Sequence, residues 1–140
     1  MSRIEDIRLA HVKRILEAYH FDIPLHHFLK NYFRENKQIG SKDRKLLRQY
    51  TYYWFRLGKA CALDEPELRL AKAVFLNETK TSPFFDYLSL RCRWTPEVAA
   101  WTYSTREKLT FLNISFSEIF PWMDELCDGL NQSNYIAGFF

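Results

Sequence analysis

Glycine, cysteine and long apolar runs are scarce in this sequence of 140 residues. The glycines stand singly, so the sequence holds no Gly-rich phosphate-binding loop. The three cysteines (Cys61, Cys92 and Cys127) form no CxxC pair, and we expect them to be reduced thiols without a metal. No window approaches the roughly 20 apolar residues of a membrane span, and the charged amino end is not a secretory signal. These absences predict a cytoplasmic protein with no membrane segment.

Strand-like alternation is also nearly absent, whereas helix start signals recur along the chain. The apolar spacing predicts helices over 4–19 and 24–36 and a longer one from Ser41, and further helices open at 64–67, 82–83 and 95–97. Because 47% of the residues are hydrophobic, the chain can bury a core. We therefore predict a single all-α domain over 1–140, a bundle of about six or seven helices.

The inner faces of the first two helices follow from their apolar spacing. Residues 108–130 have mixed apolar spacing interrupted by Pro121, and we expect them to be irregular or partly extended. We expect Asn131 to cap a final helix that the end of the sequence cuts short, and we therefore expect the chain to be truncated. The predicted inner residues are Ile4, Ile7, His11, Val12, Ile15 and Tyr19 in the first helix, and Leu25, Phe28, Leu29, Tyr32 and Phe33 in the second.

The segment 37–59, KQIGSKDRKLLRQYTYYWFRLGK, carries the clearest functional signal. Ser41 is the predicted N-cap of its helix, and Asp43 lies in the first turn, where it interacts with free backbone amides. One face is predicted to be buried and carries Leu46, Leu47, Tyr50, Tyr53, Trp54, Leu57 and Cys61. The other face carries Arg44, Lys45, Arg48, Tyr52, Phe55, Arg56 and Lys59.

Positive charge is concentrated in the amino half of the chain. Residues 1–60 hold 13 Lys and Arg against 6 Asp and Glu, a net +7, whereas residues 61–140 hold 7 against 11, a net −4. A local positive field of this kind attracts phosphates. The alternative interpretation is that the basic helix face is only solvated.

The residues of the basic segment have different expected roles. Lys45, Arg48 and Lys59 are predicted nucleic-acid contacts, and Lys37 and Lys42 flank a helix start that can add to a phosphate site. The sequence leaves open whether Arg44 and Arg56 contact phosphate or pair with a buried carboxylate. Tyr52 is a candidate for stacking on an exposed base, whereas Phe55 is expected to pack against a neighbouring helix.

The sequence contains no recognisable catalytic or metal site. His26 and His27 are adjacent, so their side chains diverge on a helix and cannot share a metal by that spacing. His11 and His20 have no partner at ligand spacing and are expected to be packed or surface residues. We expect no catalytic residue, no metal and no cofactor in this chain.

Two stretches resemble the amino-terminal domain of the Sun/Fmu family of ribosomal RNA cytosine-C5 methyltransferases. In that family an Asp-Arg pair opens a helix that closes on an aromatic-x-Arg segment, which corresponds here to Asp43-Arg44 and Phe55-Arg56. Phe120-Pro121-Trp122, Glu125-Leu126 and the segment 131–140 resemble the connection to the family's next domain.

The resemblance implies a helical fold like that of the antitermination factor NusB. It also implies that 108–140 links to a domain, missing here, that binds S-adenosylmethionine and performs catalysis. The family's catalytic cysteines follow Pro and Thr, whereas Cys61, Cys92 and Cys127 follow Ala60, Arg91 and Leu126. No catalytic residue can therefore be assigned from the family to this chain.

Three functional hypotheses follow. The first is a non-catalytic RNA-binding domain that orients ribosomal RNA for the missing methyltransferase domain, using Lys37, Lys42, Arg44, Lys45, Arg48, Tyr52, Arg56 and Lys59. The second is a protein-interaction module that docks on a partner domain through apolar residues such as Phe139 and Phe140, and that dimerises when this face is bare. The third is a DNA-binding helix-turn-helix, which the spread of cations along the whole helix disfavours.

Overall fold

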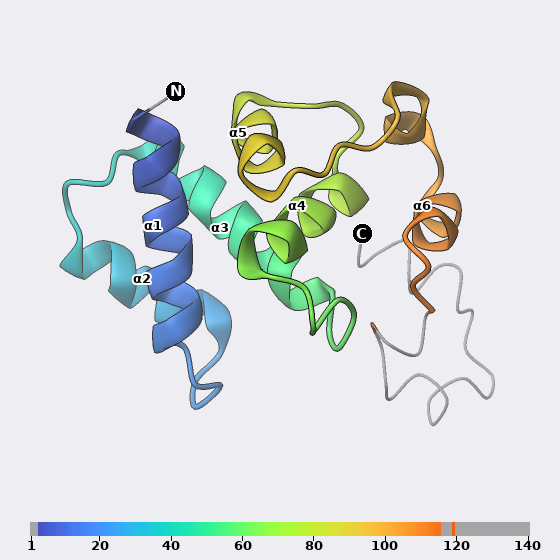
Figure 1. The fold of residues 1–140 in the computed structure, drawn as a ribbon. Coiled ribbons are helices and arrows are strands. Elements are labelled where there is room, and N and C mark those ends of the chain that lie inside the picture. The colour runs from blue at the N-terminus through green and yellow to red at the C-terminus, as the bar shows by residue number, and fades with distance from the viewer. Residues whose placement is uncertain (1–2, 116–118, 120–140) are drawn as a thin grey trace. The chain divides into compact units, whose positions relative to one another are not determined.

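The computed structural model describes residues 3–115 and 119, and within them the chain is all-α, as predicted (Figure 1). The helices are α1 (Arg3–Ala18), α2 (Leu25–Glu35), α3 (Ser41–Arg56), α4 (Pro66–Asn77), α5 (Pro83–Cys92) and α6 (Thr105–Phe111), with a 3-10 helix, η1 (Val98–Thr102), before α6. Two compact units are present, Met1–Tyr52 and Tyr53–Phe140, and their boundary falls within α3. The expectation of one domain stays a prediction.

In the first unit, α1 is tied to both α2 and α3 by polar contacts. The His11 Nδ1 and the Tyr32 hydroxyl are 2.7 Å apart, and the Arg8 guanidinium donates to the Asp43 carboxylate. Burial lowers the pKa of His11, so its imidazole is neutral in this contact near pH 7. His11 is thus a packed residue. The buried apolar residues of this unit are Leu9, Val12, Ile15, Tyr19, Leu29, Phe33, Ile39, Leu47 and Tyr50.

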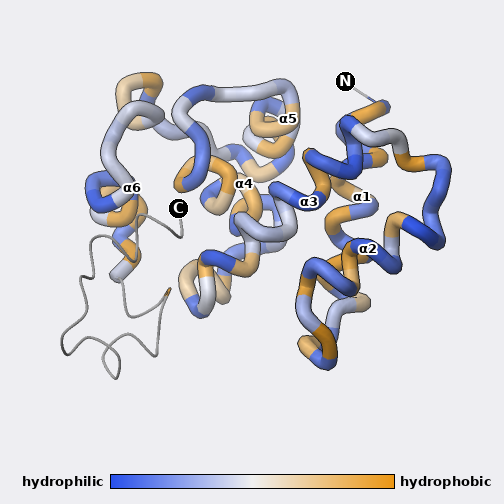
Figure 2. Tube along the Cα trace, turned by 180° about the vertical axis from the view of Figure 1, so that it is seen from behind, coloured by the Kyte–Doolittle hydropathy of each residue, from blue (hydrophilic) through white to orange (hydrophobic). Residues whose placement is uncertain are grey.

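The predicted inner face of α1 is partly wrong. Ile4 and Ile7 are 55% and 49% exposed, whereas Leu9 and Glu5 are buried. The buried face is therefore rotated toward Leu9, which the apolar spacing alone did not indicate. Figure 2 shows hydrophobic and hydrophilic residues alternating along α1, as expected for a helix with one buried face.

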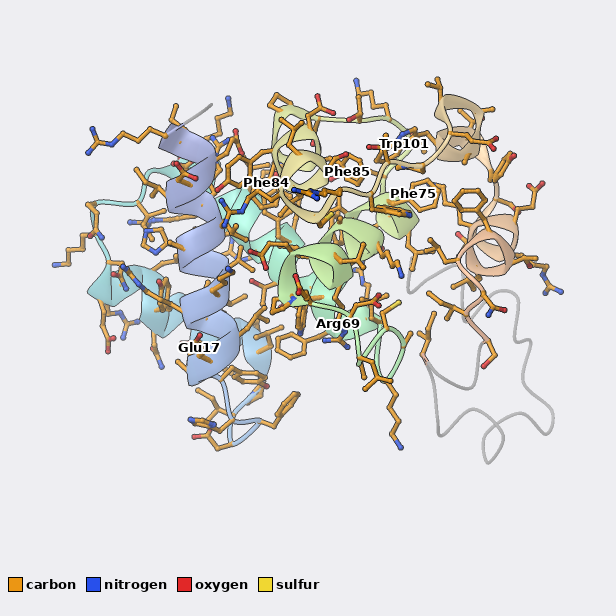
Figure 3. All side chains as sticks on the ribbon, viewed as in Figure 1. Glu17, Arg69, Phe75, Phe84, Phe85 and Trp101 are labelled. Atoms are coloured by element: carbon orange, nitrogen blue, oxygen red, sulfur yellow. The ribbon has the colours of Figure 1, made fainter. Side chains whose placement is uncertain are left out.

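In the second unit, α4 packs against both α5 and α6 around an aromatic core. The Phe75 and Phe85 rings lie edge-on to Trp101, with centroids 5.1 and 4.7 Å from the indole (Figure 3). Each such edge-to-face pair stabilises the fold by about 0.5–1.5 kcal/mol beyond the contribution of the apolar area that it buries. These rings position α4 and α5 against each other.

Local signals account for most helix starts in the second unit. Ser82 caps α5 by accepting a hydrogen bond from the Phe85 amide. At 95–97, where a helix was expected to open, the chain forms only the 3-10 helix η1. The expectation that residues from Lys108 onward are irregular is wrong at its start, because α6 extends to Phe111 behind a capping box of Ser104 and Glu107. The final helix expected from Asn131 and most of the expected 108–140 linker lie outside the described residues.

In the described part of the chain, left-handed backbone conformations occur at Gly58 and at four other residues. The left-handed backbone region is occupied by the non-glycine residues Phe21, Cys61, Arg93 and Asn113, with φ between 56° and 63°. Arg93 occupies the C-cap of α5, a position where glycine is common.

Candidate nucleic-acid interface

The first unit contains a hollow lined almost entirely by cations. Its walls come from α2, from the turn that follows it and from α3, and its volume is about 330 Å³. We call it the basic hollow, and its lining residues are Lys30, Phe33, Arg34, Lys37, Arg44 and Arg48. No Asp or Glu is among these residues, so five positive charges face one concavity.

Two arginines of the basic hollow are held in place by neutral groups. The Arg48 guanidinium lies over the Phe33 ring, 5.3 Å from its centroid, in a cation–π contact. The Arg44 Nε donates to the Ile39 carbonyl at 2.8 Å. Neither interaction cancels a charge. Among the described residues, no carboxylate lies within ion-pair distance of either arginine, nor of Lys30, Arg34 or Lys37.

Asp43 does not neutralise the basic hollow either. Its Oδ1 accepts two hydrogen bonds from Arg8 on α1, at 2.8 and 3.1 Å. The prediction that Asp43 serves the backbone amides of α3 thus missed this ion pair. The first backbone hydrogen bond of α3 runs from the Arg44 amide to the Gly40 carbonyl. Ser41 is therefore the first residue of the helix and not its N-cap, which is the position that the sequence predicted.

The structure brings together Lys37, Arg44 and Arg48 of the predicted contact residues, and it adds Lys30 and Arg34 to them. Lys42 and Lys45 are exposed on α3 outside the hollow, and Tyr52 is half-buried. Lys30 and Arg34 are four residues apart on one face of α2, and Lys37 follows in the turn, so this basic spacing was a visible signal for part of the surface.

Arg56 and Lys59 belong to the second unit. The Arg56 Nη1 donates to the Asn77 Oδ1 at 3.0 Å, and its guanidinium lies 5.9 Å from the Tyr53 ring centroid. Arg56 is therefore held by an amide and a ring, and no carboxylate of the described part pairs with it. Lys59 is exposed in the turn after α3.

That turn is fixed by Arg69 of α4. Its guanidinium lies 4.3 Å from the Trp54 ring centroid and donates to the Gly58 carbonyl at 2.7 Å and the Ala60 carbonyl at 3.2 Å. Burial lowers the pKa of Arg69 from its ordinary value. Arg69 thus has a structural role and is not available to a ligand.

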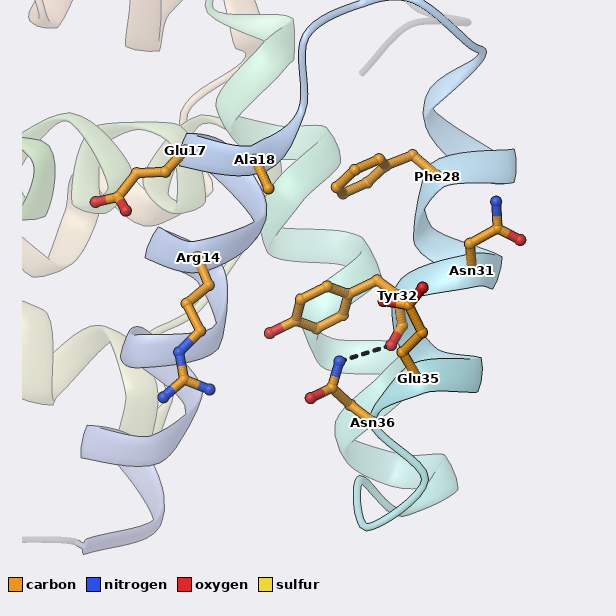
Figure 4. Close-up of a pocket in the computed structure, with 8 residues that line it drawn as sticks. All are labelled: Arg14, Glu17, Ala18, Phe28, Asn31, Tyr32, Glu35 and Asn36. Carbon is orange, nitrogen blue, oxygen red and sulfur yellow. Dashed lines mark hydrogen bonds between the residues drawn. The ribbon is translucent and has the colours of Figure 1, made fainter.

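A larger hollow, of about 610 Å³, lies between α1 and α2 (Figure 4). The Phe28 and Tyr32 rings extend from α2 toward α1, and the Asn36 amide donates to the Tyr32 carbonyl at 2.8 Å. Its lining includes Glu17 and Glu35 as well as Arg14. This mixed lining does not favour a polyanion, so the smaller basic hollow is the better candidate.

Other kinds of site were also considered. Over residues 3–115 and 119, no group of three His, Cys, Asp or Glu has a metal-binding arrangement. No helix in that part of the chain is both long and apolar enough to cross a bilayer. Burial raises the pKa of the Cys61 and Cys92 thiols, which makes them poor nucleophiles at neutral pH. Cys127, Phe139 and Phe140, with the docking face predicted there, lie outside the described residues.

The relationship of this chain to known proteins rests on its own motifs. The similarity to the Sun/Fmu family is carried by Asp43-Arg44, Phe55-Arg56 and the segment from Phe120, and it stays a prediction. Comparison with family models, curated proteins and solved structures finds none that matches this chain.

Proposed function

We propose that this chain is a non-catalytic RNA-binding domain that holds ribosomal RNA for a cytosine-C5 methyltransferase domain. The basic hollow is the observation that supports RNA binding: five cations line one concavity, and in the described residues none of them is paired with a carboxylate. The phosphate backbone is the ligand that satisfies such a surface, because each Lys or Arg that neutralises a phosphate releases a bound counterion.

The charge surrounding the hollow favours the same ligand. Lys42 and Lys45 are exposed nearby in the sequence of α3, and Asp43 between them is paired with Arg8. Half-buried Tyr52 follows on the same helix and offers a ring for stacking on a base. The ribosomal target and the methyltransferase partner, with its S-adenosylmethionine cofactor, are proposed from the sequence resemblance alone.

Charge reversal tests RNA binding directly. The variant Arg34→Glu with Arg48→Glu reverses two cations of the basic hollow. The matched control, Lys80→Glu with Arg93→Glu, makes the same change in net charge at exposed residues of the second unit. With a fluorescent ribosomal RNA hairpin, we expect the hollow variant to lose at least about tenfold in affinity and the control to bind nearly as the parent does. Equal losses in both variants would mean that only net charge matters and would refute the assignment of the site.

The identity of the RNA needs a separate measurement. Ultraviolet crosslinking of the chain in cells, followed by sequencing of the bound RNA, should enrich ribosomal fragments, and the Arg34→Glu with Arg48→Glu variant should lose them. Recovery of messenger and transfer RNA in proportion to their abundance would restrict the proposal to general RNA binding.

A further inference from the structure

The basic hollow is small and open to solvent. Its volume of about 330 Å³ corresponds to roughly ten water molecules at about 30 Å³ each. This is room for a phosphate group with an attached sugar or second phosphate. The rest of an RNA strand would then lie outside the hollow.

The arginines of the hollow are oriented before any ligand arrives. Phe33, only 3% exposed, provides a fixed ring under the Arg48 guanidinium, and the Ile39 carbonyl fixes the Arg44 Nε. The remaining guanidinium N–H groups are then available as forked donors, which match two oxygens of one phosphate. Preorganised donors lose less side-chain entropy on binding, so this arrangement favours one compact, highly charged group.

The number of charges indicates which phosphate fits. An internal phosphodiester brings one negative charge, whereas a phosphomonoester carries about −1.5 to −2 at pH 7, and a polyphosphate carries more. Five cations without a carboxylate in the lining match the larger charge. We propose that the basic hollow binds a terminal phosphate, a phosphomonoester or polyphosphate, at the 5′ end of an RNA strand or on a free nucleotide. This inference rests on the proposed function and specifies the group that its main site recognises.

The test compares RNA ends on one sequence. A 12-nucleotide RNA labelled at its 3′ end is prepared with a 5′-hydroxyl, a 5′-monophosphate or a 5′-triphosphate, and each form is titrated with the chain at fixed salt. Inorganic pyrophosphate and a nucleoside 5′-monophosphate are titrated separately by calorimetry. We expect the phosphorylated ends to bind about tenfold more tightly than the hydroxyl end, which is the effect of one or two charge-assisted hydrogen bonds.

Two variants assign the preference to the hollow. Arg44→Gln with Arg48→Gln should abolish the difference between the ends, whereas Lys80→Gln should keep it; far-UV circular dichroism checks that both remain helical. Equal affinity for all three ends in the parent chain overturns the inference and leaves the proposed RNA binding intact. A preference that persists in the Arg44→Gln with Arg48→Gln variant also overturns it.

The remaining outcomes separate the sources of the phosphate. Calorimetric binding of pyrophosphate or the nucleotide, without affinity for any RNA, supports the phosphate site on a free nucleotide and refutes the proposed function. Absence of binding by all RNAs and by both small phosphates refutes the proposed function and the inference together.

Discussion

The Arg8 side chain of α1 donates twice to Asp43 of α3, from Nη2 at 2.8 Å and from Nε at 3.1 Å. Asp43 is the one acidic residue in the segment 37–59, which carries seven Lys and Arg. The carboxylate most able to neutralise the basic segment is therefore neutralised by another helix of the same unit. Arg8 also pairs with Glu5 at 2.8 Å, so it lies between two carboxylates of the first unit.

Replacement of Arg8 should affect both folding and binding. In Arg8→Met, Asp43 loses its partner and adds an uncompensated negative charge to the basic segment. We expect the free energy of unfolding to fall by about 3 kcal/mol, because the buried Glu5 and the partly exposed Asp43 both lose their ion-pair partner. RNA affinity should fall as well, and Arg8→Met with Asp43→Asn should recover the affinity. Urea denaturation and RNA titration measure the two effects, and unchanged affinity in Arg8→Met would show that Asp43 has no influence on binding.

The salt dependence of RNA binding should report the number of phosphate contacts. For a single strand, the slope of log K against log salt is about −0.7 per neutralised phosphate charge, so neutralisation of about five phosphate charges predicts a slope of roughly −3.5. Arg48→Gln should make the slope shallower by about 0.7, because it removes one contact. Binding titrations at four salt concentrations provide both values. A slope near zero in the parent chain would contradict a phosphate interface.

Lys108 should be a major stabilising residue of the second unit. Its buried Nζ donates to the Phe75 carbonyl at 2.7 Å and the Glu78 carbonyl at 2.5 Å, and it lies 4.7 Å from the Phe75 ring centroid. Lys108→Met keeps the side-chain length but leaves two carbonyls at the end of α4 without this donor. We expect a loss of about 2 kcal/mol in urea denaturation. Lys80→Met, at an exposed site, should cause little loss.

The same lysine should make stability depend on alkaline pH. Burial lowers the pKa of Lys108 from its ordinary value of 10.5, although the Glu78 carboxylate acts in the opposite direction. The folded chain therefore releases this proton at a lower pH than the unfolded chain does. Between the lowered pKa of the folded chain and the ordinary pKa of 10.5, the unfolded state binds more protons than the folded state. The contribution of Lys108 to the free energy of unfolding therefore rises with pH up to about 10.5. The stability difference between the parent and Lys108→Met should widen over this interval, and a difference that narrows would contradict the direction of the shift.

The capping box of α6 provides a test at acidic pH. The Ser104 amide donates to the Glu107 Oε1 at 3.0 Å, and this hydrogen bond is the main reason why the pKa of Glu107 is lowered. A lowered pKa in the folded state means that stability present at neutral pH is lost as the pH falls below 4.5. Glu107→Gln should remove this component from the acid unfolding curve.

The serine of the same capping box can be tested at neutral pH. Ser104→Ala should cost about 1 kcal/mol, because the Glu107 amide loses its acceptor. Thr110→Ala is the control, since the Thr110 hydroxyl bonds only back to the Arg106 carbonyl of the same helix. Equal destabilisation by both alanines would mean that the capping box has no special role.

Much of the helical fold could be predicted because its signals are local. Pro66 and the Ser82-Pro83 pair mark helix starts wherever they occur, and α4 and α5 begin there. The capping residues Ser104 and Glu107 were equally local, but the mixed apolar spacing after Lys108 obscured them. Phe33 and Leu29 were expected on the inner face of α2, and both are buried.

The basic hollow could be predicted only in part. Lys37, Arg44 and Arg48 belong to one basic segment, so their charge is visible in the sequence. The four-residue spacing of Lys30 and Arg34 indicates that they share a face of α2. That this face meets α3 depends on the turn after α2, which no local pattern determines. Ile4 and Ile7 illustrate the same limit: the period of α1 was clear, but the direction of its buried face depends on which helices pack against it.

Arg93 and Asn113 have left-handed backbone conformations, and at such positions substitution by glycine can change thermal stability. An arginine at positive φ costs about 1–2 kcal/mol, and a glycine there avoids that penalty at the expense of a freer unfolded chain, whereas Asn adopts this region more readily. Exchanging Arg93 for glycine should therefore raise the melting temperature slightly. Both positions lie in the second unit, far along the sequence from the arginines and lysines of residues 30–48. A substitution that raises the melting temperature there should therefore leave phosphate binding by the basic hollow unchanged.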